Sequence, residues 1–187
     1  MIVSMSRIPD PFQSRQSNVR ELLAHSYGWT AMAHAAIADG ATHYGPKHYA
    51  VRGITVRRLL DGSRPRTLMD EERVKALTSG CRICGADERL TLDHLVPTFR
   101  GGEDEPANAV WLCRSCNSSK RDRDLLLWLA AKGELPPVLL LRHYLKLFWK
   151  ELEKRGELET EWVHVDAFPF EFGGLPRRAL LLNQVRL

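Results

Sequence analysis

The feature that most constrains this chain is the arrangement of its cysteines. All four lie in two C-x-x-C pairs, Cys81–Cys84 and Cys113–Cys116, with 28 residues between the pairs. Two residues between two thiolates allow a tight knuckle to present both sulfurs to one tetrahedral ion. Two disulfides or two free dithiols are the alternatives, but a shared four-cysteine Zn²⁺ site uses every cysteine. Four thiolates fill the coordination shell, so this zinc would be structural and not catalytic.

Composition bounds the compartment and the class of protein. The chain has 187 residues, of which 44% are hydrophobic and 27% charged, as in ordinary globular proteins. Its longest apolar stretch, Leu125–Ala131, is far shorter than the roughly 20 residues of a membrane span. Met1–Phe12 lacks the continuous apolar run of a secretory signal. We therefore expect a cytoplasmic protein without membrane contact, in a reducing compartment where cysteines more often bind metal.

Charge is unevenly distributed along the chain. The formal net charge is only +4, and the basic surplus lies before the first cysteine, most densely in Arg52–Arg66. Within this stretch, Arg57 and Arg58 are candidate nucleic-acid contacts, because arginine neutralises backbone phosphate. An arginine-rich solvated surface is an equally good explanation of the same residues.

The pattern of residues divides the chain into three regions. Residues 1–80 read as mostly helical, with a helix starting at Ser17–Ala24 and capped by Ser17, and another over Trp29–Asp39 that Gly40 ends. Ile54–Leu60 fits either a strand or a short helix. Met69–Leu77 reads as a helix, because Asp and Glu stand at its N-terminal end.

The other two regions follow the first cysteine pair. Residues 81–132 read as strand, loop, strand and helix, namely Arg89–Leu92, Pro97–Asn108, Ala109–Leu112, and a helix from Arg114 towards Gly133. Residues 133–187 hold an amphipathic helix over Val138–Arg155, an alternating stretch at Trp162–Phe172 that favours a strand, and an apolar tail.

The residues between and after the cysteine pairs carry a resemblance to a known family. Asp93-His94 is followed by Pro97, by Gly101-Gly102 and by Asn108, and the second pair is followed by Asn117 and Lys120. In this order and spacing, the stretch Cys81–Asp124 resembles the HNH endonucleases, which are built on a ββα-metal motif. The resemblance implies a zinc-stapled ββα-metal core at 81–132. Together with the helical N- and C-terminal flanks read from the residue pattern, it predicts an α+β fold that is predominantly helical.

The same resemblance implies roles for individual residues. His94 would be the general base, because a neutral imidazole can take a proton from water near pH 7. Asp93 and Asn117 would hold a divalent metal, and Asn108 would hold the loop that orients His94. An amide oxygen at position 117, where many relatives have His, favours Mg²⁺ or Mn²⁺ as the catalytic ion. Lys120 and two further residues of the following turn are candidate phosphate contacts, namely Arg121 and Arg123.

These residues predict a metal-dependent endonuclease that hydrolyses DNA, with RNA not excluded as a substrate. Restriction or phage defence is a fitting setting, and a sensor or ATPase subunit is a candidate partner because the chain has no Walker-type loop. A homodimer is a further possibility. The alternatives are a zinc-stapled nucleic-acid adaptor that does not cleave, and an interaction protein whose helical flanks do the work. The last alternative predicts that the change His94→Ala leaves function intact.

Overall fold

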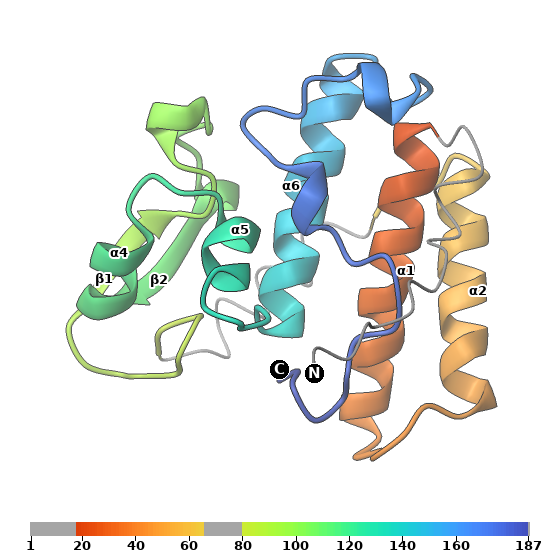
Figure 1. Ribbon diagram of the computed structural model, residues 1–187, viewed down its shortest axis with the longest axis horizontal. Coiled ribbons are helices and arrows are strands. Elements are labelled where there is room, and N and C mark those ends of the chain that lie inside the picture. Colours follow the sequence, from red (N-terminus) through yellow and green to blue (C-terminus); the bar gives the residue numbers. More distant parts are fainter. Residues whose placement is uncertain (1–17, 66–79, 187) are drawn as a thin grey trace, which may run out of the picture.

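The computed structural model describes residues 18–65 and 80–186. Over these residues the fold is predominantly helical with one small antiparallel sheet, which confirms the predicted α+β class. The elements are shown in Figure 1 and are, in order, α1 (Val19–Ala38), α2 (Pro46–Leu60), β1 (Leu90–His94), β2 (Ala109–Cys113), α4 (Arg114–Lys120), α5 (Leu125–Ala130) and α6 (Val138–Lys154). No helix among the described residues is both long and apolar enough to cross a bilayer.

The two helical segments predicted near the N-terminus form one helix, α1. Ser17, the predicted cap, lies outside the described residues, and Asn18 caps α1 by accepting a hydrogen bond from the Glu21 amide at 2.9 Å. Gly40 follows the helix with a φ of 64°, a left-handed conformation that glycine adopts without strain. The predicted end of this helix is therefore confirmed.

The ambiguous stretch before the first cysteine is helical. α2 begins at Pro46, a residue favoured in the first turn because its missing N–H would have no helical partner there. The helix continues to Leu60, so the strand alternative for Ile54–Leu60 is wrong. The predicted helix Met69–Leu77 lies outside the described residues.

The middle of the chain forms a hairpin followed by two short helices. β1 pairs antiparallel with β2, with Leu90 opposite Cys113 and His94 opposite Ala109. The single helix predicted from Arg114 towards Gly133 is wrong. Arg121 has a φ of 53°, which ends α4, and the Asp124 carboxylate then accepts two backbone hydrogen bonds at the start of α5.

The C-terminal region contains the predicted helix but no strand. The prediction of a strand at Trp162–Phe172 is wrong, since short 3-10 turns, Trp162–His164 and Phe172–Gly174, occupy its two ends. Its apolar residues instead enter the core as single side chains. Phe170, for example, stacks on Phe148 of α6 with ring centroids 4.6 Å apart.

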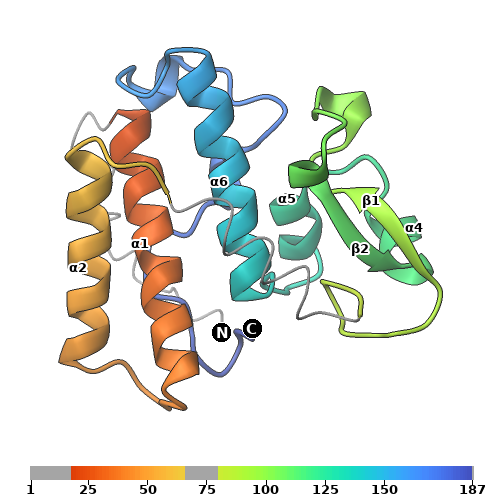
Figure 2. The same cartoon turned by 180° about the vertical axis from the view of Figure 1, so that it is seen from behind.

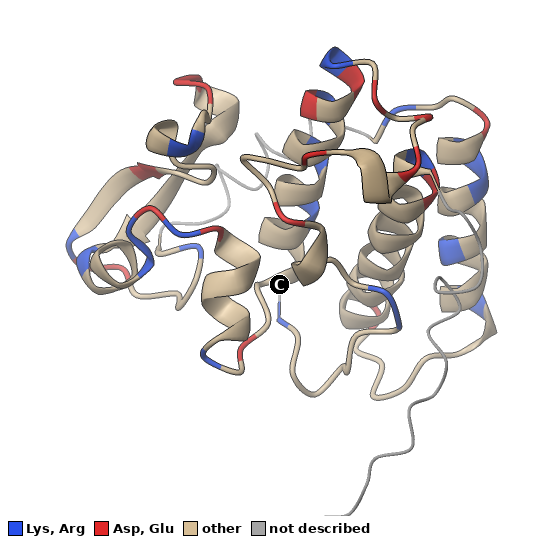
Figure 3. Ribbon diagram, turned by 45° about the horizontal axis from the view of Figure 1, so that its top comes forward, with Lys and Arg blue, Asp and Glu red and all other residues tan. Residues whose placement is uncertain are grey.

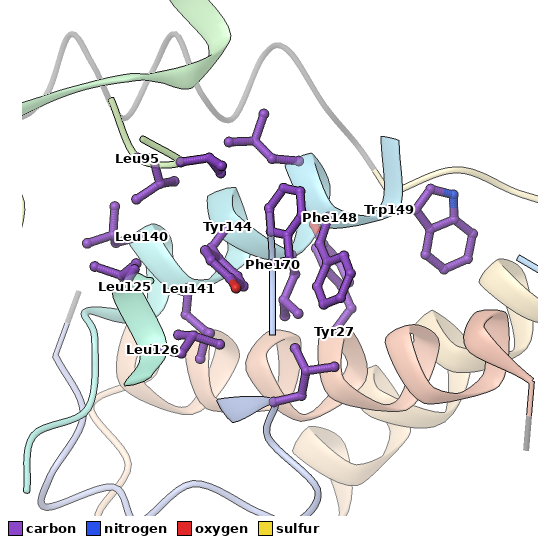
Figure 4. Packing of buried hydrophobic residues seen from close by; sticks show 14 of the residues in the cluster. Tyr27, Leu95, Leu125, Leu126, Leu140, Leu141, Tyr144, Phe148, Trp149 and Phe170 are labelled. Atoms are coloured by element: carbon purple, nitrogen blue, oxygen red, sulfur yellow. The ribbon is translucent and has the colours of Figure 1, made fainter. Parts of the chain in front are cut away.

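Helix α6 is the element around which the other parts pack. It lies between α1 on one side and α5 with the hairpin on the other, as both views show (Figure 1, Figure 2). Arg142 of α6 donates to Tyr27 Oη in α1 at 3.1 Å, and Tyr144 donates to the buried carboxylate of Asp124 at 2.5 Å. The buried residues form one continuous cluster that includes Tyr27, Leu95, Leu125, Phe148 and Phe170 (Figure 4).

Candidate functional site

The four cysteines meet at the open end of the hairpin, as the spacing predicts. Their sulfur atoms all lie within 4.8 Å of one another, and none is in a disulfide. Cys84 Sγ and Cys113 Sγ are 3.7 Å apart. Zinc bound to four thiolates at about 2.3 Å would place its sulfurs about 3.8 Å apart, so the cluster fits a tetrahedral Zn²⁺.

Two cysteines of the cluster have pKa values shifted in opposite directions. Burial raises the pKa of Cys81, but hydrogen bonds from the backbone amides of Cys84, Cys113 and Ile83 outweigh it and bring this pKa down to about 7. Burial raises the pKa of Cys116 well above that of a free thiol. A divalent ion would stabilise the thiolate form of all four residues, because metal binding displaces their protons.

The cluster is coupled to the helix that follows it. Cys113 ends β2, and its sulfur accepts a hydrogen bond from the Cys116 amide at 3.4 Å, so Cys113 also caps α4. The second knuckle therefore fixes where α4 begins. Asn117 stands on α4 directly after the last cysteine, which makes its placement depend on the cluster.

One face of β1 meets α4 and brings two of the predicted ligands together. Asn117 Nδ2 donates to Thr91 Oγ1 at 3.1 Å, and Lys120 Nζ donates to Asp93 Oδ2 at 3.3 Å. Thr91 and Asp93 are two apart on a strand and therefore point to the same side. The Asn117 contact uses the amide nitrogen, so the amide oxygen takes no part in this hydrogen bond.

Within residues 18–65 and 80–186, no second cluster of His, Cys, Asp or Glu ligands accompanies this pair. The cysteines are the only set of three or more His, Cys, Asp or Glu ligands within reach of one ion in the described ranges. Asp93 and Asn117 offer one carboxylate and one amide oxygen. This donor set fits Mg²⁺ or Mn²⁺, since hard cations accept oxygen ligands and retain several waters.

His94 ends β1 and has a partner that the sequence did not indicate. Its Nε2 lies 2.9 Å from Asp104 Oδ1. The His94 side chain is 32% exposed, while that of Asp104 is 90% exposed. Asp is an ordinary turn residue, so a single Asp in a Gly- and Pro-rich loop gives no signal that it contacts His94.

Asn108 closes the loop that follows His94. Its buried side chain accepts from the Val96 amide at 2.8 Å and donates to the carbonyls of Val96 and Glu103 at 2.8 and 2.9 Å. The Asn108 carbonyl also accepts from the Leu95 amide at 2.7 Å. These bonds tie both ends of the loop to one side chain, the arrangement needed for a residue that supports His94.

Gly102 lets the two arms of this loop approach. A Cβ at position 102 would lie 2.0 Å from the Val96 carbonyl oxygen and 2.9 Å from Asn108 Nδ2. We expect Gly102→Ala to lower the free energy of unfolding by about 1–3 kcal/mol, the usual range for overpacking. Gly53→Ala is the control, because position 53 is in α2 and has open space. It should raise stability by about 0.5–1 kcal/mol. Equal denaturation midpoints for the two variants would contradict this account.

Lys120 does not occupy the position expected of a phosphate contact. Its side chain is only 1% exposed, and besides Asp93 it donates to the His94 carbonyl at 3.0 Å. Burial lowers the pKa of Lys120, while the charge of Asp93 acts in the opposite direction. Lys120 thus joins α4 to β1, and its expected place on the nucleic-acid surface is corrected to a place inside the fold.

The predicted arginines lie in two separate places. Arg121 and Arg123 are exposed and line a surface hollow together with Ser118 and Ser119. Arg123 also donates to the carbonyls of Lys120 and Ser119, at the end of α4. Two others, Arg57 and Arg58, are exposed on α2, which lies on the far side of α1 and α6 from the hairpin (Figure 3). The structure therefore does not bring them to the site around His94.

Comparisons with known proteins bear on one segment of the chain. No curated protein and no solved structure matches the chain. Residues 81–124 match the sequence model of the HNH endonuclease family, which confirms the resemblance predicted for the segment that carries the four cysteines, His94 and Asn117.

Proposed function

We propose that this protein is a metal-dependent HNH endonuclease that hydrolyses DNA phosphodiester bonds. The family match indicates nuclease activity in general. The observation that supports the specific proposal is that Asp93 and Asn117 share the face between β1 and α4, while His94 follows Asp93 at the end of the strand. Restriction or phage defence in the cytoplasm is the setting that we propose for it.

Each residue has a distinct task in the proposed reaction. His94 takes a proton from the attacking water, and its neighbour Asp93 faces the α4 side with Asn117. A divalent ion held by these two oxygen ligands would polarise the phosphate and stabilise the leaving 3′ oxygen. Lys120 of α4 donates to the Asp93 carboxylate, and Arg121 and Arg123 are the proposed contacts to backbone phosphate.

A nucleic-acid adaptor that does not cleave is the second candidate. The observation in its favour is the ion pair between Lys120 and Asp93, because a buried ammonium already neutralises part of the charge that would bind the metal. The two functions differ in one result. The adaptor binds nucleic acid and leaves it intact in any divalent ion.

A nicking assay on supercoiled plasmid tests the proposal. The wild-type protein should nick the plasmid in Mg²⁺ or Mn²⁺ and not in EDTA, with zinc content measured in every sample. Single-stranded DNA and RNA of the same sequence, assayed in parallel, define the substrate. Binding without cleavage in both ions would favour the adaptor and overturn the endonuclease.

The change Asp93→Asn tests the ligand assignment in the same assay. It removes the charged ligand but keeps the shape of the side chain, so the Mg²⁺ concentration for half-maximal nicking should rise about tenfold or more. Asp87→Asn is the matched control, because Asp87 is exposed in the same segment. Melting temperatures of both variants show whether the Lys120 environment has collapsed. An unchanged Mg²⁺ requirement in a folded Asp93→Asn protein would remove Asp93 from the metal site.

A further inference from the structure

We propose that Asp104 is a positioning residue for His94, and that Lys150 and Lys154 of α6 hold Asp104 in place from outside the HNH segment. The inference rests on the proposed role of His94 as general base. Asp104 lies inside the matched segment but is not one of the motif residues, whereas Lys150 and Lys154 lie beyond the match, which ends at residue 124.

The contact between Asp104 and His94 determines which ring nitrogen can react. Asp104 Oδ1 lies 2.9 Å from Nε2, and a carboxylate can only accept a hydrogen bond from that nitrogen. The neutral ring then carries its proton on Nε2 and its lone pair on Nδ1. The contact therefore orients the ring and leaves Nδ1 to take the proton from water.

The loop that carries Asp104 is held by α6. Glu103, before Asp104, pairs with Lys154 at 2.8 Å and with Lys150 at 3.2 Å, and Glu105, after it, pairs with Lys150 at 2.6 Å. Lys150 and Lys154 are one helical turn apart and reach the loop from the same side of α6. Both neighbours of Asp104 are thus tied to one helix.

Electrostatics within this cluster supports a defined loop position. The hydrogen bonds of Lys154 and Lys150 lower the pKa of Glu103 to about 2, so its carboxylate stays charged at neutral pH. The Asn108 side chain and amide bind the carbonyls of Glu103 and Glu105, each at 2.9 Å. Backbone and side chains on either side of Asp104 are therefore fixed, while its own side chain projects towards His94.

Because Asp104 is exposed, the direction of the change in kcat when it is removed distinguishes a positioning role from simple charge repulsion. A 90% exposed carboxylate beside a phosphate-binding site repels the substrate. If Asp104 did nothing else, its removal would tighten DNA binding and raise kcat/KM. A positioning role predicts the opposite change in kcat, because the His94 ring loses its fixed orientation.

The experiment compares Asp104→Ala, Asp104→Glu and the double variant Lys150→Ala/Lys154→Ala in the plasmid assay, with full-length protein. We expect Asp104→Ala to lower kcat about 10- to 100-fold, the range typical of residues that orient a reacting group, with KM unchanged or lower. Asp104→Glu, which keeps the carboxylate, should recover part of kcat. The lysine double variant should lower kcat by less, and adding it to Asp104→Ala should cause no further loss.

Lys47→Ala/Lys132→Ala is the matched control, because it removes two exposed, ion-paired lysines far from this loop in sequence. It should leave kcat at the wild-type value. If Asp104→Ala turns over as fast as wild type or faster, while His94→Ala is inactive in the same assay, the positioning role is overturned and the proposed function stands.

Nitrogen-15 NMR of the His94 ring tests the contact with Asp104 independently of the proposed endonuclease activity. At a fixed pH of about 8, without Mg²⁺, the wild-type ring should carry its proton on Nε2 alone. Asp104→Ala should mix the two neutral forms, and His94→Ala identifies the signal. This result stands even if the wild-type protein cleaves nothing, in which case the proposed function fails and the positioning contact remains. Identical ring signals in wild type and Asp104→Ala would overturn the contact itself.

Discussion

Replacing His94 with alanine is expected to slow plasmid nicking by about 10²- to 10⁴-fold, the usual contribution of a general base. The side chain is one-third exposed, and its backbone carbonyl still accepts the hydrogen bond from Lys120 in the variant. The fold should therefore survive the change, with zinc content and melting temperature close to wild type. Initial rates at saturating plasmid and Mg²⁺ measure the effect.

His164→Ala is the matched control for this prediction. His164 is well exposed and contacts only the carboxylate of Glu161 among the ion pairs of the described residues. Its removal should leave the nicking rate unchanged. A His94→Ala protein that retains zinc and nicks as fast as wild type would exclude His94 as the base.

Loss of the zinc site is expected to have the largest effect on stability. Cys113→Ser removes one thiolate and also the sulfur that caps α4, so both the ion and the start of this helix are affected. Structural zinc contributes roughly 10–16 kcal/mol to folding in small zinc domains, which is as large as the whole stability of a typical domain. We expect zinc content near zero and a fall of at least about 10 °C in melting temperature.

Ser115→Ala is the control within the same knuckle, because Ser115 is exposed and lies between the two cysteines. It should bind zinc and melt like wild type. Hydrogen exchange of backbone amides locates the damage, which should be greatest in β1, β2 and α4. A Cys113→Ser protein with wild-type melting temperature would show that the cluster is not needed for the fold.

The cysteine pairs and the hairpin could be predicted because their signals are local. A C-x-x-C turn presents two sulfurs whatever surrounds it, and only the meeting of the two knuckles requires the rest of the fold. The strands were predicted to within two residues, since turn-forming residues flank both of them. The resemblance also implies that Asp93 and Asn117 hold one metal ion, which predicts that the two residues lie near each other.

Errors arose where tertiary contacts decide the structure. The stretch Arg121–Asp124 alternates in charge like an exposed helix, but the Asp124 carboxylate is buried as a cap and Tyr144 of α6 donates to it. Trp162–Phe172 alternates like a strand, but no neighbouring strand in the described residues pairs with it. Phe170 and Phe172 of this stretch instead pack individually against Phe148 of α6.

The site itself was predicted only in part for the same reason. Lysine is ordinarily a surface residue. Lys120 is buried because α4 packs on β1, where its ammonium group contacts Asp93, 27 residues earlier in the chain. Asp104 and the α6 lysines carry no local signal, because the contact between Glu103 and Lys154 spans 51 residues. Such pairs become visible only when both partners have been placed in space.

The continuous core has a consequence for how proteins of this kind are delimited. The recognisable segment ends at residue 124, yet Leu95, Val110 and Leu112 of that segment are buried in the same cluster as Tyr144 and Phe148 of α6. Cut out at the limits of its sequence match, the segment would expose this apolar surface to water and lose the lysines that hold its loop. The segment that matches the family model is therefore smaller than the unit that packs around one core, and a fragment made to test the proposed function must extend at least through α6.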